Sequence, residues 1–353
     1  MLLFHLHLGL TDNIHRILIH DILIDGSTPL EIPSNYSQKV RYDLNNVTIW
    51  NPTVDTYKLL QNRVKIFYLT NCSIFHVFLL PSMEWLAITN SNVSEIKIIH
   101  TDEIDEIATE QIKVRNASVR FLPIDINRLV PFKELQWRNN DIDSLDLAVL
   151  NGLKNLKYAV FTACSIKEVP NHTAVLLPSL CELELGHNQI SHIYTTRWTM
   201  PELRTLNLEN NQLTELPILN HFHKLQTLNL NCNLISSLNQ YQLFQLKKLS
   251  TVILANNHIS QLSPTSDIHF VVLTHLHLNG NQLERLDLRK WKSPVLKQLH
   301  VEKNQLRTIE GFEAIAGSLE LFDFDDNPWD CEWVHFAMVD LEENLQLKWA
   351  KSC

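Results

Sequence analysis

The chain has 353 residues, a formal net charge of −9 at pH 7 and a pI near 6.0. This acidic balance argues against nucleic-acid binding, because a phosphate-binding surface needs clustered Lys and Arg. No apolar run reaches the ~20 residues of a membrane-spanning helix. No glycine-rich phosphate loop and no metalloprotease, serine-hydrolase or paired CxxC motif occurs. We therefore expect a non-enzymatic protein without a membrane segment in this chain, and we assign it no metal and no cofactor.

Residues 1–39 are predicted to form an N-terminal capping region or a truncated start. Residues 1–10 are as apolar as a signal-peptide core but lack a basic start and a small-residue cleavage site, so a signal remnant and a first strand both stay open. Residues 14–24 alternate like a strand. Residues 27–37 contain Pro29 and Pro33, which indicates a loop.

One apolar pattern recurs along residues 40–326, most clearly in LRTLNLENNQLTEL at residues 203–216. Leu206 and Leu208 are two residues apart, so both point to one face of an extended strand. Asn211 follows where the chain must bend, and its amide can bond backbone groups that the turn leaves unpaired. One such unit cannot bury its own apolar face, so the units must stack as coils of a solenoid.

The pattern can be counted thirteen times, in steps of 19 to 26 residues, by the first inward-facing residue of each strand. Steps near 24 are typical of extracellular leucine-rich repeats. From Leu183 onward the asparagine recurs regularly, whereas in the first half Cys72 and Cys164 are among the residues that replace it. These two are predicted to be structural thiols. The counted positions are Val47, Phe67, Leu86, Ile112, Leu135, Ala159, Leu183, Leu206, Leu228, Val252, Leu276, Leu299 and Phe322.

Residues 327–353 are predicted to cap the last repeat. Apolar residues after Asn327 recur at helical spacing, and an open-ended solenoid needs such a cover. A bridge between Cys331 and Cys353 would close a loop of about twenty residues and stabilise the cap by roughly 3 kcal/mol. Such a bridge indicates an oxidising compartment. The helical residues are Trp333, Val334, Ala337, Met338 and Leu341.

The motif NPWDC at residues 327–331 resembles the C-terminal cap of extracellular leucine-rich-repeat proteins, including Toll-like receptor ectodomains and neuronal adhesion proteins. From about residue 40 to the end, the chain is similar to the leucine-rich-repeat immune proteins of mosquitoes, on its degenerate early repeats VTIWNPTV and VRNASVRFLP and on this cap. The resemblance implies an α/β fold, a curved leucine-rich-repeat horseshoe with a parallel sheet on the concave face and a disulfide-bonded cap. The chain departs from the family because it has no coiled coil before its end at Cys353.

The same resemblance implies a secreted, extracellular protein of innate immunity that binds a complement-like thioester protein or another leucine-rich-repeat protein. The alternative is the ligand-binding ectodomain of a cell-surface receptor or adhesion protein, whose anchor would lie beyond residue 353, and a cytoplasmic scaffold is a further rival. Six sequons favour an extracellular location. They are Asn35, Asn46, Asn71, Asn92, Asn116 and Asn171.

The outward strand positions form the concave face and are the candidate partner-binding residues. The early aromatic residues are hot-spot types, although packing under the N-terminal cap would also explain them. The late His and Asp residues suggest a pH-sensitive contact near pH 6, a metal site or a solvated polar ladder. Cys181 and Cys232 are expected to be half-buried thiols, unless one pairs with another chain. The candidates are Trp50, Tyr68, Trp85, Lys113, Arg115, Arg138, Glu184, His277, His300 and Asp323.

Overall fold

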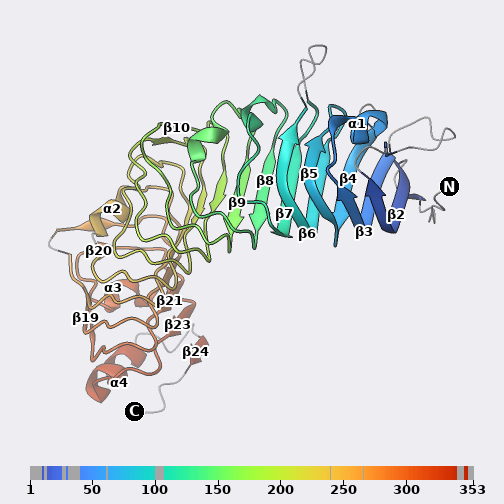
Figure 1. The fold of residues 1–353 in the computed structure, drawn as a ribbon. Helices are drawn as coiled ribbons and strands as arrows, with labels where there is room; N and C mark the ends of the chain where they lie inside the picture. The colour runs from blue at the N-terminus through green and yellow to red at the C-terminus, as the bar shows by residue number, and fades with distance from the viewer. Residues whose placement is uncertain are drawn as a thin grey trace. The chain divides into compact units, whose positions relative to one another are not determined.

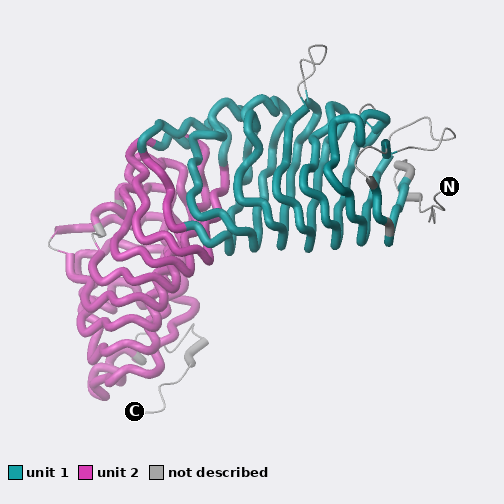
Figure 2. The backbone as a smooth tube through the Cα atoms, in the orientation of Figure 1, with its two compact units in different colours: residues 1–166, 172–180, 198–200 teal, residues 167–171, 181–197, 201–353 magenta. Residues whose placement is uncertain are grey.

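The chain folds into two compact units, which Figure 2 shows in different colours. Unit 1 comprises residues 1–166, 172–180 and 198–200, and unit 2 comprises residues 167–171, 181–197 and 201–353. Each unit is a stack of coils, and each coil contributes a strand to a parallel sheet (Figure 1). The computed structural model describes residues 10–11, 14–25, 29–30, 40–60, 63–99, 107–238, 240–264, 266–339 and 346–348.

The sheet of unit 1 is parallel except at its start, where β1 runs antiparallel to β2. Two of its strands are long and each pairs with two shorter ones. β3 pairs with β4 through its first half and with β5 through its second half, and β6 pairs with β4 and β5 in the same way. The strands are β1 (Leu10–Thr11), β2 (Ile14–Asp25), β3 (Val40–Trp50), β4 (Val64–Thr70), β5 (Ser73–Leu79), β6 (Trp85–Ile98), β7 (Gln111–Ala117), β8 (Glu134–Arg138) and β9 (Tyr158–Thr162). A small parallel pair joins β10 (Val175–Leu176) to β12 (Trp198–Thr199).

The sheet of unit 2 is built from three-residue strands, all parallel. These are β11 (Glu182–Glu184), β13 (Thr205–Asn207), β14 (Thr227–Asn229), β15 (Thr251–Ile253), β18 (His275–His277), β21 (Gln298–His300), β23 (Leu321–Asp323) and β24 (Gln346–Lys348). Two smaller parallel groups are β16 (Gln261–Leu262) with β19 (Arg285–Asp287) and β22 (Ile309–Glu310), and β17 (Ile268–His269) with β20 (Trp291–Lys292).

Helices within the described residues are short, and the longest, α4, has nine residues. None of them is both long and apolar enough to cross a bilayer. The α-helices are α1 (Val54–Tyr57), α2 (Gln240–Phe244), α3 (Glu313–Ala316) and α4 (Cys331–Val339), and the 3-10 helices are η1 (Lys58–Leu60), η2 (Ile126–Arg128) and η3 (Leu147–Leu150).

The predicted inward positions of unit 2 form one aligned row in the sheet. Each is at most 3% exposed, because the coils above and below cover it. The parallel leucine-rich-repeat solenoid is therefore confirmed. The row consists of Leu183, Leu206, Leu228, Val252, Leu276, Leu299 and Phe322.

One predicted register in unit 1 is wrong. Phe67 pairs with Tyr42, not with Val47, and Tyr42 is fully buried. Val47 lies beyond a corner at Asn46, whose φ of 53° turns the chain between the two halves of β3. Both halves alternate apolar and polar residues, so the sequence pattern fitted the wrong one. The parallel sheet also begins closer to the N-terminus than the predicted repeats do, because β2, inside the region assigned as an N-terminal cap, pairs with β3.

A left-handed corner residue recurs in the coils, and it explains the asparagines that stand one place early in the first half. Asn and Asp tolerate positive φ better than other residues with a Cβ. In unit 2 the next residue is the buried asparagine, and the corner itself varies, as with Lys303 before Asn304. In unit 1 the corners at Asn46, Asn71, Asn90, Asn116 and Asn139 have φ between 50° and 54°.

The buried asparagines bind backbone groups of two successive coils, as the sequence predicted. Asn257 is 3% exposed, and its Nδ2 donates to the carbonyl oxygens of Leu230, Leu254 and Ala255 at 3.0, 3.0 and 3.1 Å. Its Oδ1 accepts from the backbone N–H of Ile235 at 3.0 Å. The side chain thereby satisfies donors and acceptors that would be unpaired inside the turn.

Cys72 and Cys164 occupy the equivalent place in unit 1 and are buried thiols. The Cys164 Sγ lies 3.3 Å from the carbonyl oxygen of Trp137 and 3.5 Å from that of Thr162, to which the thiol donates. The thiol thus replaces part of the asparagine's bonding. This confirms the structural role predicted for both residues, while Cys181 and Cys232 are half-buried thiols.

Alkylation of Cys164 should be slow in the folded protein. Burial raises the pKa of this thiol to about 11, so its thiolate fraction near pH 8 is roughly 100-fold below that of a thiol with its ordinary pKa of 9.0. Iodoacetamide labelling followed by peptide mass analysis measures the rate. The control is the same thiol in urea, where labelling should be at least ~100-fold faster. Equal rates with and without urea would contradict the buried position.

The predicted helix of the C-terminal cap is confirmed as α4, which follows Asn327. Trp329 is 7% exposed, its Nε1 donates to the carbonyl oxygen of Phe324 at 2.7 Å, and its ring stacks on Trp333 at 4.8 Å between centroids. Leu341 and Cys353 lie outside the described residues, and so does the predicted bridge from Cys331 to Cys353. Strand β24, which the sequence did not predict, pairs with β23 beyond this helix.

Candidate functional site

The outward side chains of the parallel strands form, in each unit, a surface that we call the outer sheet face. On this face of unit 1, cationic and aromatic side chains from β3, β4, β6 and β7 lie in sequence against one another. The Arg41 guanidinium lies 4.1 Å from the centre of the Tyr68 ring. The Tyr68 and Trp85 rings are 5.6 Å apart, and the Lys113 Nζ lies 5.2 Å from the Trp85 ring centre. We call Arg41, Tyr68, Trp85 and Lys113 the cation–aromatic ladder.

The two cations of the ladder are held by carboxylates. Asp43 is 4% exposed and accepts from the Nε atoms of Arg41 at 2.9 Å and Arg16 at 2.5 Å. The Lys113 Nζ lies 3.0 Å from a Glu134 carboxylate oxygen. These contacts fix the long cationic side chains beside the rings, so the surface is ordered before any partner binds.

The polar atoms of the two aromatic residues of the ladder lie in different surroundings. Burial is the main cause that raises the pKa of Tyr68 above its ordinary value. The buried indole N–H of Trp85 has no hydrogen-bond partner among the described residues. Tyr and Trp are among the side-chain types that dominate protein–protein hot spots.

The structure brings together only part of the predicted basic and aromatic set. Trp50 is 62% exposed, but it lies beyond the Asn46 corner and pairs with Asp25, away from the strand positions of Tyr68 and Trp85. Arg115 and Arg138 occupy paired positions on β7 and β8. Sequence reasoning missed Arg41 and Asp43 because it placed the register of β3 five residues too late.

On the outer sheet face of unit 2, acidic and amide side chains alternate between strands. Glu184 accepts from Asn207 Nδ2 at 3.0 Å. Glu209, two residues after Asn207, accepts from Asn229 Nδ2 at 2.8 Å and lies 3.2 Å from the Nε2 of His187. Each carboxylate is therefore bonded to a neighbouring coil.

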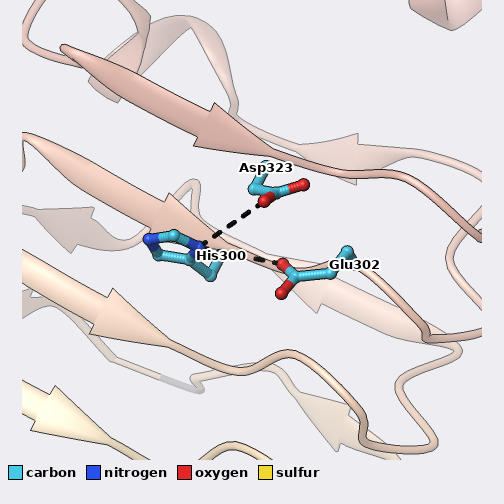
Figure 3. Close-up of side chains that lie close together, drawn as sticks. All are labelled: His300, Glu302 and Asp323. Carbon is cyan, nitrogen blue, oxygen red and sulfur yellow. Dashed lines mark ion pairs between the residues drawn. The ribbon is translucent and has the colours of Figure 1, made fainter. Parts of the chain in front are cut away.

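The predicted row of His277, His300 and Asp323 is present on β18, β21 and β23. The two imidazole rings stack at 4.3 Å with an interplanar angle of 11°. The Nδ1 of His300 lies 3.9 Å from Asp323 Oδ2 and 3.9 Å from Glu302 Oε2 (Figure 3). Burial, together with His300 and His275, lowers the pKa of His277 to about 4. The sequence suggested that this imidazole titrates near pH 6, but with the lowered pKa it is already neutral there.

An apolar hollow in unit 1 had not been singled out in the sequence. It encloses about 610 Å³, and Phe75, Phe121 and Ile124 on its wall are 57%, 76% and 78% exposed. Phe121 follows Val119 and Arg120 in the degenerate repeat, and Ile124 lies three residues further on. Their exposure makes this hollow a second candidate contact surface.

Most of the predicted sequons lie on the surface. Asn46, Asn71, Asn92 and Asn116 are exposed, and Asn171 is half-buried. Asn35 lies outside the described residues. Exposure meets the physical requirement for glycosylation, which stays a prediction at each of these sites.

The model of the family described as Leucine rich repeat matches residues 160–213 and 223–283, and a second model, Leucine Rich repeats (2 copies), matches residues 201–243. Adenylate cyclase of Schizosaccharomyces pombe is 24% identical over 234 residues, which are 57% of this chain and 14% of the cyclase. Leucine-rich repeat-containing G-protein coupled receptor 5 of Xenopus tropicalis is 31% identical over 144 residues, or 40% of this chain and 15% of the receptor. The chain thus spans only a small part of these two relatives.

Lumican of Rattus norvegicus is 27% identical over 267 residues, which are 72% of this chain and 75% of lumican. Among solved structures, an internalin from Listeria monocytogenes aligns with 95% of this chain and 87% of its own at 18% identity and a TM-score of 0.58. Plant peptide hormone receptor RGFR1 in complex with RGF2 aligns with 86% of this chain and 54% of its own at 21% identity and a TM-score of 0.51. At these identities the structural matches show the fold alone. The repeat matches, the relatives and the stacked coils together identify the chain as a leucine-rich-repeat protein.

Proposed function

We propose that this is a secreted, non-enzymatic protein that binds another protein through the outer sheet face of unit 1, at the cation–aromatic ladder. The observation that carries the proposal is the ordered succession of Arg41, Tyr68, Trp85 and Lys113 across four coils. Two rings between two cations supply large contact area, hydrogen-bond donors and positive charge in one place. Such a face suits a protein partner with acidic and apolar groups at its surface.

The proposed partner is a complement-like thioester protein, and the proposed setting is innate immunity. This rests on the resemblance of the cap and early repeats to the mosquito immune proteins. The similarity to a G-protein coupled receptor and to lumican supports an extracellular setting, without naming a partner. The ectodomain of a cell-surface receptor is the second candidate, favoured by the similarity to a G-protein coupled receptor and by the fold shared with a plant hormone receptor.

Replacing Trp85 by alanine should weaken binding to a purified complement-like thioester protein by about 30-fold, the effect of losing a hot spot of ~2 kcal/mol. Surface plasmon resonance with the full chain immobilised gives the affinity. The matched control is Tyr194→Ala, an aromatic side chain of unit 2 that is 58% exposed and outside the ladder. Circular dichroism of each variant shows whether it is folded.

The outcomes test the proposed partner and the proposed binding surface independently. If the unmodified chain does not bind the thioester protein, that partner is wrong. If Trp85→Ala and the control bind equally well, the ladder is not the binding surface. Trp50→Ala is a third arm, and we expect less than a threefold change because Trp50 lies apart from the ladder.

Secretion itself has a direct chemical test. Protein collected from the medium of expressing insect cells should give a disulfide-linked peptide pair containing Cys331 and Cys353, and glycans on exposed sequons such as Asn46 and Asn92. Peptide mass analysis with and without reduction detects both. Free thiols at both cysteines and bare sequons would favour the cytoplasmic scaffold.

A further inference from the structure

The side chains of His300, Glu302 and Asp323 converge on the outer sheet face of unit 2 (Figure 3). We propose that these three residues form a binding site for a divalent cation of the zinc type. The inference is independent of the ladder in unit 1 and of any partner. It assigns a chemical role to residues for which the sequence left a metal, a pH-sensitive contact and a solvated row as alternatives.

The distances fit a shared ion better than direct hydrogen bonds. The His300 Nδ1 is 3.9 Å from each of the two carboxylate oxygens, and one ligand atom from each residue lies within 4.8 Å of the others. A hydrogen bond needs about 3 Å. Zinc binds nitrogen and carboxylate oxygen at about 2.0–2.2 Å, so two ligands of one ion lie roughly 3–4 Å apart. A cation between the three residues reaches all of them with small side-chain rotations.

The charge at the site also favours a dication. Glu302 and Asp323 place two carboxylates beside one imidazole, and their side chains are only 19% and 10% exposed. A bound cation with two positive charges would lie close to both carboxylates and to the imidazole nitrogen, which suits its charge.

The sheet holds the three donors in place. His300 lies on β21 and Asp323 on the adjacent β23, and backbone hydrogen bonds of 2.8 Å from Leu278 to His300 and from Val301 to Asp323 fix the spacing. The stacked His277 ring restrains the plane of His300. Ligands supported by a rigid framework and by a packed neighbour lose little freedom when the ion binds.

The donor set selects among metals. Calcium and magnesium prefer sites made of oxygen alone, whereas zinc accepts imidazole together with carboxylate. Three protein donors leave a coordination position for water on the solvent side of the face. We therefore expect zinc to bind and magnesium not to compete at equal concentration.

Isothermal titration of ZnCl₂ into the chelator-treated full chain at pH 7.5 tests the site. We expect one tightly bound ion per chain, and at least a ~tenfold loss of affinity in each of His300→Gln, Glu302→Gln and Asp323→Asn. The control His187→Gln removes an imidazole that lies 3.2 Å from a single carboxylate, and its affinity should equal that of the unmodified chain. Zinc should also raise the melting temperature of the unmodified chain and of the control only.

Melting of the metal-free variants shows whether each one folds, and Glu302→Gln and Asp323→Asn keep the size and shape of the side chain, so at least one folded variant is expected. The proposal is wrong if the unmodified chain takes up no stoichiometric zinc. It is equally wrong if folded variants of the three ligands bind zinc as tightly as the control does.

Discussion

Replacing Asn257 by alanine should lower the free energy of unfolding by about 3 kcal/mol, since each buried group left without a partner costs ~1–3 kcal/mol. The substitution removes three donated bonds to carbonyl oxygens and one accepted bond from Ile235. The site is 3% exposed, so water does not replace these bonds. Urea unfolding followed by circular dichroism measures the change.

Two variants sharpen this test. Asn279→Ala removes a half-exposed amide of the outer sheet face and should change stability by no more than ~0.5 kcal/mol. Asn257→Cys should fall between the two, because the thiol of Cys164 in the equivalent place bonds two carbonyl oxygens. If Asn257→Ala costs no more than Asn279→Ala, the buried amide does not support the coils.

Replacing Trp329 by alanine should destabilise the C-terminal end of unit 2 by about 3–5 kcal/mol, the range for removing a buried Trp. The ring packs between Phe324 and Trp333, with centroids at 6.0 and 4.8 Å, and its Nε1 bonds the Phe324 carbonyl oxygen. Loss of the ring opens the end of the solenoid core to water. Thermal unfolding and amide hydrogen exchange near Phe324 report the effect.

The aromatic ring and the hydrogen bond of Trp329 can be separated. Trp329→Phe keeps much of the packing and loses the N–H, so we expect a smaller cost of about 1–2 kcal/mol. Phe336→Ala is the control, because Phe336 is on the neighbouring helix α4 and is 56% exposed. A cost for Trp329→Ala as small as that of Phe336→Ala would show that the cap does not depend on this ring.

The sequence predicted some residues of the candidate sites and missed others. The row of His277, His300 and Asp323 followed from the sequence, because repeats of nearly constant length put equivalent residues on neighbouring strands. Its chemistry did not follow. The low pKa of His277 and the 3.9 Å separations around His300 depend on burial and rotamers. In unit 1 the sequence supplied Tyr68, Trp85 and Lys113 but not Arg41.

The sequence by itself determined the solenoid, the inward row from Leu183 to Phe322, the role of the buried asparagines and the helix after Asn327. Each of these is a local pattern repeated at nearly fixed spacing, and repetition fixes the register because a coil buries its apolar face against a neighbour with the same pattern. Tertiary structure alone decided the register of β3 and with it the positions of Trp50 and Arg41. Both halves of that strand alternate with period two, so only pairing with β4 across the Asn46 corner distinguishes them.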